Sequence, residues 1–263
     1  MSLTETIELS DGDEYLRVHV LPARGFDLGR AWFRDTEIAW ISPLGELPWQ
    51  GDFARSFGGG LVTTCGLRNV GLPSEGQPQH GWYSSLPARD VEAQRQFARA
   101  RVVEADVPGE TLELTREIRV DGGGVSIVDR TRNPGHEPVP APLLYHVNLL
   151  WNAVDVDSDE VLPRDDDARV GDWRSAGPPG PERVYEHVGA SRTVVTRGPV
   201  RITITSTLPR LWQWIHPSYG VLGIEPANCS VLGRAHDRAE GRLPVLEPGE
   251  ERVTGLHIDA EDA

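Results

Sequence analysis

The chain has 263 residues and a formal net charge of −14, and all of its 26 basic residues are arginine. This length can bury a substantial core, and hydrophobic and charged fractions of 38% and 25% exclude wholesale disorder. An acidic chain argues against a nucleic-acid or anionic-membrane partner, because both recruit a basic surface. No apolar run reaches the roughly 18 residues of a membrane-spanning helix. The acidic N-terminal segment is also unlike a signal peptide, so we expect a cytoplasmic protein.

Glycine and proline interrupt the chain at short intervals, with 28 Gly and 21 Pro in all. This spacing leaves little room for long helices and favours short strands joined by turns. We find no internal repeat and no linker. The sequence therefore predicts one all-β domain over residues 1–263, with a large sandwich as its architecture.

Alternating apolar and polar residues predict the individual strands. Residues 91–104 are rich in helix formers, but their apolar positions do not repeat at helical spacing, so we interpret them as a strand. Glycines at residues 122–124 and at Gly198 suit the tight turns of two hairpins. In chain order, the predicted strands and hairpins are 16–20, 91–104, 117–128, 193–204 and 253–258.

Two segments have the composition of long surface loops. Residues 155–167 contain seven carboxylates, and residues 177–181 are rich in Pro and Gly. The two cysteines, Cys65 and Cys229, are too few for a disulfide framework or a thiolate metal site, so we expect buried free thiols.

Three consecutive glycines, residues 58–60, precede the apolar segment 61–67. Such a run indicates a bulge or a close backbone approach next to a buried strand. It is not a phosphate-binding loop, because that motif requires a lysine and the chain has none.

Three titratable residues occupy unusual sequence contexts. His80 precedes a glycine in a Pro/Gly-rich loop, where a histidine is either an ordinary surface residue or part of a site. His146 interrupts the apolar run 143–149, so a buried ring must find hydrogen-bond partners, from the backbone or from a functional group. Glu225 follows an apolar run, and a buried carboxylate usually has a task or a cationic partner. Because Pro226 cannot continue a central ladder, we expect Glu225 at a strand end, facing a cleft.

Tryptophan is frequent, with eight Trp against five Phe. Trp212 and Trp214 are two residues apart and share one face if they lie in a strand. Trp82, Trp151 and Trp173 are further candidates for a flat floor on which a sugar ring could stack, although tryptophan is also ordinary core material.

Taken together and in order, four strings resemble a known family. They are GGGLVTTCGLRNVG (58–71), HGW (80–82), LLYHVN (143–148) and GIEPANC (223–229). The sequence resembles the aldose 1-epimerase (galactose mutarotase)-like superfamily, in particular its branch known as domain of unknown function 4432. The likeness extends over about residues 15 to 258.

This resemblance implies a β-supersandwich of mostly antiparallel strands with a sugar site in an open cleft. It also implies a cofactor-free reaction in which an acid protonates the pyranose ring oxygen and a base takes the proton of the anomeric hydroxyl. His146 matches the acid and Glu225 matches the base. His80 matches a further histidine of the family, which holds the ring oxygen or a neighbouring hydroxyl. With one acid and one base, a bell-shaped pH profile is expected. The candidates for further contacts to the sugar are Arg24, Arg68, Asn69, Trp214 and Asn228.

Two alternatives remain open at this point. His80, His146 and Glu225 could form a two-histidine, one-carboxylate metal site for a sugar isomerase. The protein could also bind carbohydrate without catalysis, since fold does not determine function. The expected partner is a small sugar in either case, and exposed sandwich edges are compatible with a homodimer.

The sequence leaves open whether the sugar is neutral or anionic. Three segments, 5–14, 155–167 and 247–263, carry a net charge of −16, so the remaining body is +2. Overall acidity is therefore no argument against an anionic sugar, which arginine would bind well.

Overall fold

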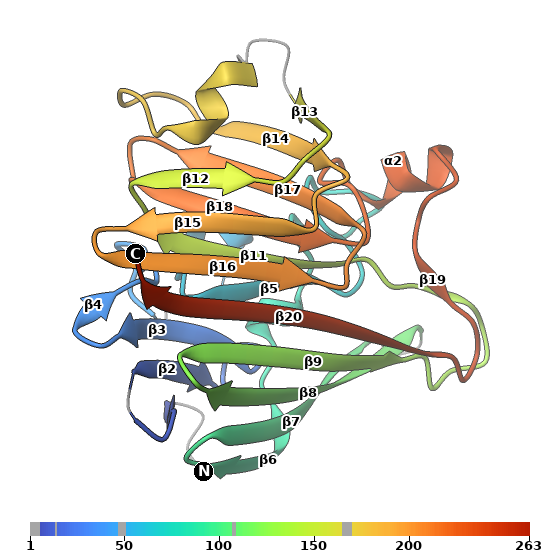
Figure 1. Ribbon diagram of the computed structural model, residues 1–263. Coiled ribbons are helices and arrows are strands. Elements are labelled where there is room, and N and C mark those ends of the chain that lie inside the picture. Colours follow the sequence, from blue (N-terminus) through green and yellow to red (C-terminus); the bar gives the residue numbers. More distant parts are fainter. Residues whose placement is uncertain (1–5, 14, 47–50, 107–108, 165–169) are drawn as a thin grey trace.

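The computed structural model describes residues 6–13, 15–46, 51–106, 109–164 and 170–263. Two antiparallel sheets stack on each other (Figure 1). The first has ten strands, in the order β1 (Ile7–Ser10), β2 (Leu16–Leu21), β3 (Asp27–Phe33), β5 (Val62–Gly66), β11 (Leu143–Leu150), β18 (Val221–Ala227), β17 (Arg210–His216), β14 (Arg183–Val188) and β13 (Glu160–Pro163), with β4 (Thr36–Glu37) beside β3.

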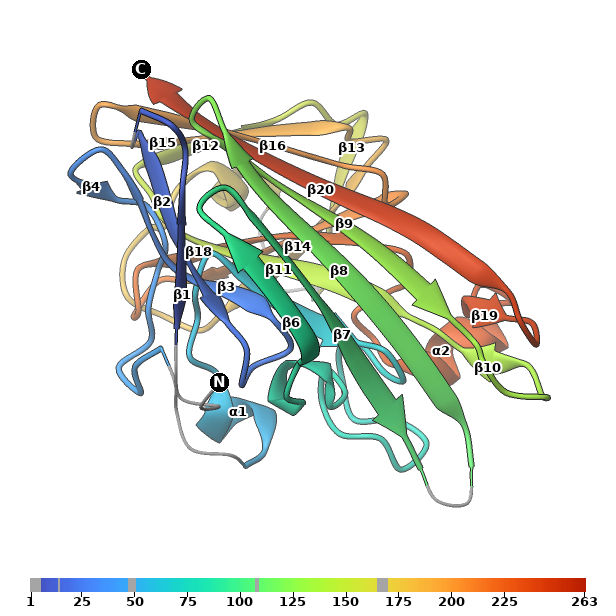
Figure 2. The same cartoon turned by 90° about the horizontal axis from the view of Figure 1, so that it is seen from below.

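The second sheet has eight strands and lies in front of the first in Figure 1. Its long strands run side by side in the view from below (Figure 2). The order is β12 (Ala153–Val156), β15 (Arg192–Arg197), β16 (Val200–Ser206), β20 (Glu251–Asp262), β9 (Gly124–Arg132), β8 (Thr111–Asp121), β7 (Phe97–Ala105) and β6 (Arg89–Gln94). The fold is thus the predicted all-β supersandwich.

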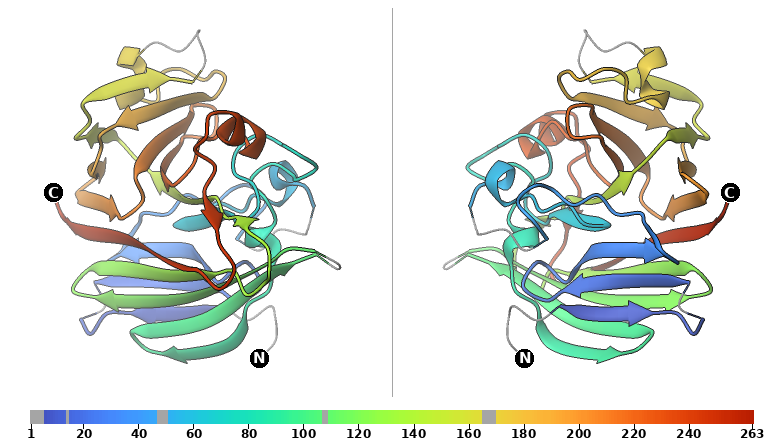
Figure 3. Two further views of the ribbon diagram at one scale, coloured as in Figure 1. Left: turned by 90° about the vertical axis from the view of Figure 1, so that its right-hand side faces the viewer. Right: turned by 90° about the vertical axis from the view of Figure 1, so that its left-hand side faces the viewer.

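Helices are few and short. The α-helices are α1 (Phe53–Ser56) and α2 (Arg234–Ala239), the 3₁₀ helices are η1 (Tyr83–Ser85) and η2 (Val170–Arg174), and a small ribbon pairs β10 (Val139–Pro140) with β19 (Val245–Leu246). Figure 3 shows α1 and α2 on the outer side of the ten-stranded sheet, away from the other sheet. In the part of the chain that the structure describes, no helix is long and apolar enough to cross a membrane.

The predicted strands follow the expected alternation. β8 alternates buried and more exposed residues along its length and pairs with β9 across the predicted glycine turn, and β15 and β16 form the second hairpin. The segment 91–104 is extended as predicted, but it forms two strands, β6 and β7, that pair with each other. The segment 155–167 is not simply a loop, because β12 ends within it and β13 lies within it; residues 165–167 are outside the described part.

The glycine run before β5 allows a close backbone approach, as predicted. A Cβ at Gly59 would lie 2.5 Å from the carbonyl oxygen of Trp40, and one at Gly60 would lie 2.5 Å from that of Leu28. Both glycines also have a positive φ, which disfavours other residues. Cys65 and Cys229 are buried free thiols, again as predicted.

The main core lies between the sheets and contains one fully buried cluster of charges. Arg116 in β8 donates to both carboxylate oxygens of Asp129 in β9, at 2.9 and 2.7 Å, and to Asp27 at 2.6 Å. Thr64 in β5 accepts from Arg116, and the Tyr145 hydroxyl of β11 donates to Asp129 at 2.9 Å. This cluster, which we call the interior cluster, joins the two sheets on the inner face of β11.

Candidate active site

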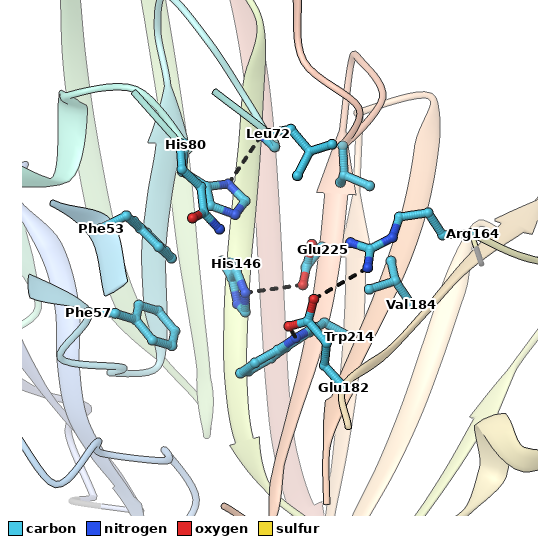
Figure 4. A pocket seen from close by; sticks show the side chains of 13 residues that line it. Phe53, Phe57, Leu72, His80, His146, Arg164, Glu182, Val184, Trp214 and Glu225 are labelled. Atoms are coloured by element: carbon cyan, nitrogen blue, oxygen red, sulfur yellow. Dashed lines mark hydrogen bonds and ion pairs between the residues drawn. The ribbon is translucent and has the colours of Figure 1, made fainter. Parts of the chain in front are cut away.

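A second, smaller hydrophobic cluster covers the outer face of the ten-stranded sheet. It contains Cys65, Leu144 and Trp212, with Phe53 of α1 and Trp214 packed against it. Because side chains alternate along a strand, Tyr145 points to the interior cluster while its neighbours in β11 point to this outer face. The candidate site is built on that face (Figure 4).

His146 and Glu225 come together in the middle of this face. β11 pairs with β18 so that Val147 faces Ile224 and Asn148 faces Gly223, which sets His146 opposite Glu225. Nε2 of His146 lies 3.1 Å from Oε1 of Glu225, and the two side chains are only 5% and 4% exposed. The register of two central strands therefore creates the pair (Figure 4).

Gly223 leaves the space that the pair occupies. A Cβ at this position would lie 2.7 Å from Cε1 of His146 and 2.9 Å from Oε1 of Glu225. Contacts this short would force one of the two side chains to move. The glycine of the GIEPANC string is therefore needed for the geometry of the site.

Burial shifts both groups toward their uncharged forms. It raises the pKa of Glu225 to about 8, with Glu182 acting in the same direction and Arg164 opposing it. Burial also lowers the pKa of His146 to about 3, with a smaller contribution from His80. Between these values the pair holds one proton, which resides on Glu225. The resting pair is thus uncharged, because a charged pair is costly to bury.

His80 stands across the cavity from the pair. Its ring lies 6.3 Å from that of His146 between centroids, and it packs on Phe53 at 4.4 Å. The backbone N–H of Gly71 donates to Nδ1 of His80 at 3.3 Å, and burial lowers the pKa of His80 to about 4. Neutral His80 therefore carries its proton on Nε2 and is a hydrogen-bond donor.

The cavity around these residues has a volume of about 150 Å³. Phe53 and Phe57 form one wall, and Trp214 lies edge-on to His146 with a centroid distance of 5.4 Å. The indole N–H of Trp214 donates to Glu182 at 2.8 Å, and Glu182 in turn accepts from Arg164 at 3.3 Å. Figure 4 shows Arg164 and Glu182 beside the pair, on the side opposite the two phenylalanines.

Glu225 lies inside β18 and not at its end. Pro226 pairs with Leu211 of β17, and the strand continues to Ala227. On the β11 side, Leu144 pairs with Ala227 and Val147 pairs with Ile224, and the ladder between these two pairs is interrupted beside Pro226. A proline is tolerated in this central strand because the missing N–H falls at that interruption.

Four of the expected sugar contacts do not line the cavity, because other parts of the protein use their polar groups. Arg24 donates to the carbonyl of Ser56 in α1. Arg68 pairs with Asp106 and Glu110. Asn69 and Asn228 bond to backbone groups: Asn69 joins the loop of residues 72–78 to the N-terminus of α2, and Asn228 bonds to residues 141 and 143. These side chains support the elements around the site and do not reach into it.

The tryptophans divide between the core and the cavity. Trp212 and Trp214 share a face as predicted, but Trp212 is buried and donates to the carbonyl of Cys229. Trp173 is buried, Trp151 packs against the main core, and Trp82 is 48% exposed. Of the five candidates, only Trp214 lines the cavity among the described residues.

Sequence reasoning missed several residues of the cavity. Arg164 lies within one segment that was interpreted as a surface loop, and Glu182 follows the other. Phe53 begins α1, and Phe57 follows its last residue. A spacing of four residues between two phenylalanines before the glycine run was a signal for α1. No local pattern distinguishes Arg164 or Glu182 from exposed charges.

His80, His146 and Glu225 do not converge as metal ligands in this structure. Within the described residues, no group of three or more His, Cys, Asp or Glu side chains could hold one metal ion. His146 and Glu225 contact each other directly, while His80 faces them across the cavity.

Comparison with solved structures supports the fold. A "putative aldose 1-epimerase" from Klebsiella pneumoniae has a TM-score of 0.83 at 22% identity, over 94% of this chain and 77% of that chain. The Slr1438 protein from Synechocystis has a TM-score of 0.78 at 17% identity, over 98% and 96%. A GalM/aldose epimerase homologue from C. elegans has a TM-score of 0.69 at 12% identity, over 98% and 99%. No curated protein matches the sequence significantly.

These likenesses, at identities below 25%, concern the fold alone. The family assignment comes from the sequence, which matches the model of "Domain of unknown function (DUF4432)" over residues 4–260, nearly its whole length. The chain therefore belongs to the DUF4432 family and has the fold of the aldose 1-epimerase-like proteins.

Proposed function

We propose that the protein interconverts the anomers of a neutral aldose by general acid–base catalysis. The observation that carries this proposal is the buried His146–Glu225 pair, 3.1 Å apart, beside a cavity that Trp214 lines. The fold supports the same reading by analogy, since several neighbours are named for aldose epimerases.

The reaction requires one proton donor and one proton acceptor at the anomeric centre. His146, once protonated, donates to the ring oxygen while Glu225 takes the proton of the anomeric hydroxyl, and the bond between C1 and the ring oxygen breaks. Rotation about C1–C2 exposes the other face of the aldehyde. Ring closure then returns both protons to their donors, so no cofactor and no net proton are consumed.

The direct contact between the two side chains links the resting state to the reactive one. At neutral pH the shared proton lies on Glu225, whose pKa is raised to about 8. Its transfer along the 3.1 Å contact to His146 produces the acid and the base together. The sugar's ring oxygen and anomeric hydroxyl then replace that contact and stabilise the separated charges.

The surrounding residues orient the sugar. His80 offers its Nε2–H to a hydroxyl, and the Trp214 ring is available to stack on the C–H face of a pyranose. Charge in the cavity favours a neutral substrate, because Arg164 is already paired with Glu182 at 3.3 Å.

Exchange spectroscopy by NMR tests the proposal across neutral and anionic aldoses. Wild-type protein should accelerate anomer exchange of a neutral aldose, and Glu225→Gln and His146→Asn should each lose about 10²- to 10⁴-fold in rate. Circular dichroism verifies that both variants fold. Full activity in both variants would contradict the assignment, and sugar binding without catalysed exchange would favour a carbohydrate-binding protein instead.

A further inference from the structure

A second cavity adjoins the first on the outer face of the ten-stranded sheet. It has a volume of about 410 Å³ and shares four lining residues with the reaction cavity: Phe53, Phe57, Gln79 and Trp214. The mechanism proposed above uses only the first cavity. The sequence contains no motif for the second, which the fold assembles from segments far apart in the chain.

The walls of the second cavity are largely aromatic. Trp40 lies 5.9 Å from Phe57 and 6.5 Å from Tyr219, measured between ring centroids. His216 lies 4.6 Å from Tyr219 and 5.8 Å from Trp214. The rings therefore form a continuous series that ends beside the catalytic pair, because Phe57 is 5.3 Å from His146.

The charge of this lining restricts its occupant. None of the described lining residues is Asp, Glu or Arg, whereas the reaction cavity contains Arg164, Glu182 and Glu225. A charged ring would lose its hydration there without gaining a partner. An uncharged ring with apolar C–H faces fits, because aromatic side chains offer it a flat apolar surface.

Size also points to an occupant that extends over both cavities. Ligand sites generally have volumes of about 300–1,000 Å³. The reaction cavity, at about 150 Å³, is below that range, and the adjoining cavity, at about 410 Å³, is within it. Gln79 lines both and supplies an amide between them.

From this continuity we infer that the aromatic cavity binds the second, uncharged ring of a reducing disaccharide. This inference rests on the proposed function, since the first ring must place its anomeric carbon at His146 and Glu225. The glycosidic bond then joins the second ring to an oxygen of the first ring other than the anomeric one. The substrate is therefore an oligosaccharide with a free reducing end and not a monosaccharide alone.

The inference is tested with D-glucose, D-galactose, maltose, cellobiose, lactose and isomaltose as probes. Anomer exchange is followed by NMR, and binding is followed by tryptophan fluorescence. At least one disaccharide should exceed its own reducing monosaccharide in kcat/KM and in affinity by about 10-fold, since tenfold corresponds to about 1.4 kcal/mol and one ring face can bury enough apolar surface for that.

Two variants separate the two cavities without disturbing the core. The Tyr219 side chain is 56% exposed and only its backbone carbonyl accepts from Trp40 Nε1, so Tyr219→Ala should fold. Ala54 is exposed on α1 and lines the second cavity, so Ala54→Phe should fill it. Both should remove the disaccharide advantage and leave monosaccharide exchange within about twofold, while Tyr219→Phe, which keeps the ring, should behave like wild type.

The failures of the two proposals give different results. Equal kcat/KM for monosaccharides and disaccharides, or a disaccharide advantage that survives in Ala54→Phe, would overturn the second-ring site and leave the proposed function standing. If no sugar shows catalysed exchange, the proposed function fails, and the second-ring site is then decided by binding alone. Tighter disaccharide binding that both variants abolish supports it, and equal affinities overturn it.

Discussion

The protein buries titratable side chains on both faces of the ten-stranded sheet. The interior cluster and the His146–Glu225 pair differ in how completely their polar atoms are hydrogen-bonded. On the inner face of β11, between the sheets, Arg116 is held by four hydrogen bonds to Asp27, Thr64 and Asp129. On the outer face of β11, His146 contacts Glu225 through one nitrogen, and its other ring nitrogen is buried without a hydrogen-bond partner.

Two consecutive residues of β11 belong to the two clusters. Tyr145 donates to Asp129 in the interior cluster, and His146 meets Glu225 at the cavity. Burial alone therefore does not identify a reactive site. An incompletely satisfied pair next to a cavity does, because its proton is available to a ligand, whereas a saturated network is committed to joining the sheets.

The largest expected effect is a loss of stability when a residue of the interior cluster is replaced. Arg116→Met leaves Asp27 and Asp129 buried without their cation, which should lower the free energy of unfolding by about 3–5 kcal/mol. Urea denaturation followed by circular dichroism measures the loss. Glu225→Gln is the matched comparison and should change stability by less than about 1 kcal/mol, because burial already favours an uncharged group there. A loss in Glu225→Gln as large as that in Arg116→Met would mean that the two clusters have the same structural role.

Gly223→Ala should come next, with an effect on catalysis. The new Cβ would lie within 3 Å of both members of the pair, and a displacement of about 1 Å can cost about 100-fold in rate. NMR exchange spectroscopy measures the rate. Gly255→Ala is the control, because its Cβ would meet nothing closer than 3.5 Å. Wild-type exchange in Gly223→Ala would show that the observed pair geometry is not the reactive one.

The pH dependence sharpens the distinction between the clusters. The His146–Glu225 pair is reactive while it holds one proton. A plot of kcat/KM against pH should therefore have a plateau, and kcat/KM should fall about tenfold per pH unit on either side of it. Above pH about 8, Glu225 loses the shared proton, and below pH about 3, His146 gains a second one. Exchange rates measured across this range, with circular dichroism at each pH, separate the titration from unfolding. A profile of kcat/KM with a single limb near pH 6.5 would indicate an unperturbed histidine instead.

The smallest expected effect concerns Glu182. Its carboxylate raises the pKa of Glu225, so Glu182→Gln should move the basic limb of the profile to lower pH. The shift should be a fraction of a pH unit and weaken with added salt, because Glu182 is 46% exposed. Glu160→Gln in neighbouring β13 is an exposed control and should leave the limb in place. An equal shift in both variants would attribute the effect to net charge and not to contact with the site.

Much of the fold was predictable because its signals are local. Alternation over 117–128 and 193–204, with glycine at the turns, predicted two hairpins that the structure contains. The interior cluster was not predictable, because Arg116 and Asp129 read as ordinary polar positions of exposed strand faces. The third partner, Asp27, comes from the other sheet, so the cluster depends on how the sheets stack.

The site was predictable in part for the same reason. His146 and Glu225 drew attention as polar residues in apolar runs, and the structure brings them into contact. Arg68, Asn69 and Asn228 were selected from motifs without knowledge of which face they occupy, and they bond to other protein groups. The reactive role of the pair itself stays a proposal.

By itself, the sequence determined the all-β class, the family and the two residues that stand out chemically, because patterns with a period of two and ordered motifs are properties of the chain alone. Tertiary structure decided everything that depends on register and on contacts between distant segments. Register sets His146 opposite Glu225, and strand stacking turns one face of β11 toward a saturated network and the other toward a cavity. The same packing unites Trp40, Phe57 and Tyr219 into an aromatic cavity, which no local pattern could predict because these rings meet only after the chain has folded.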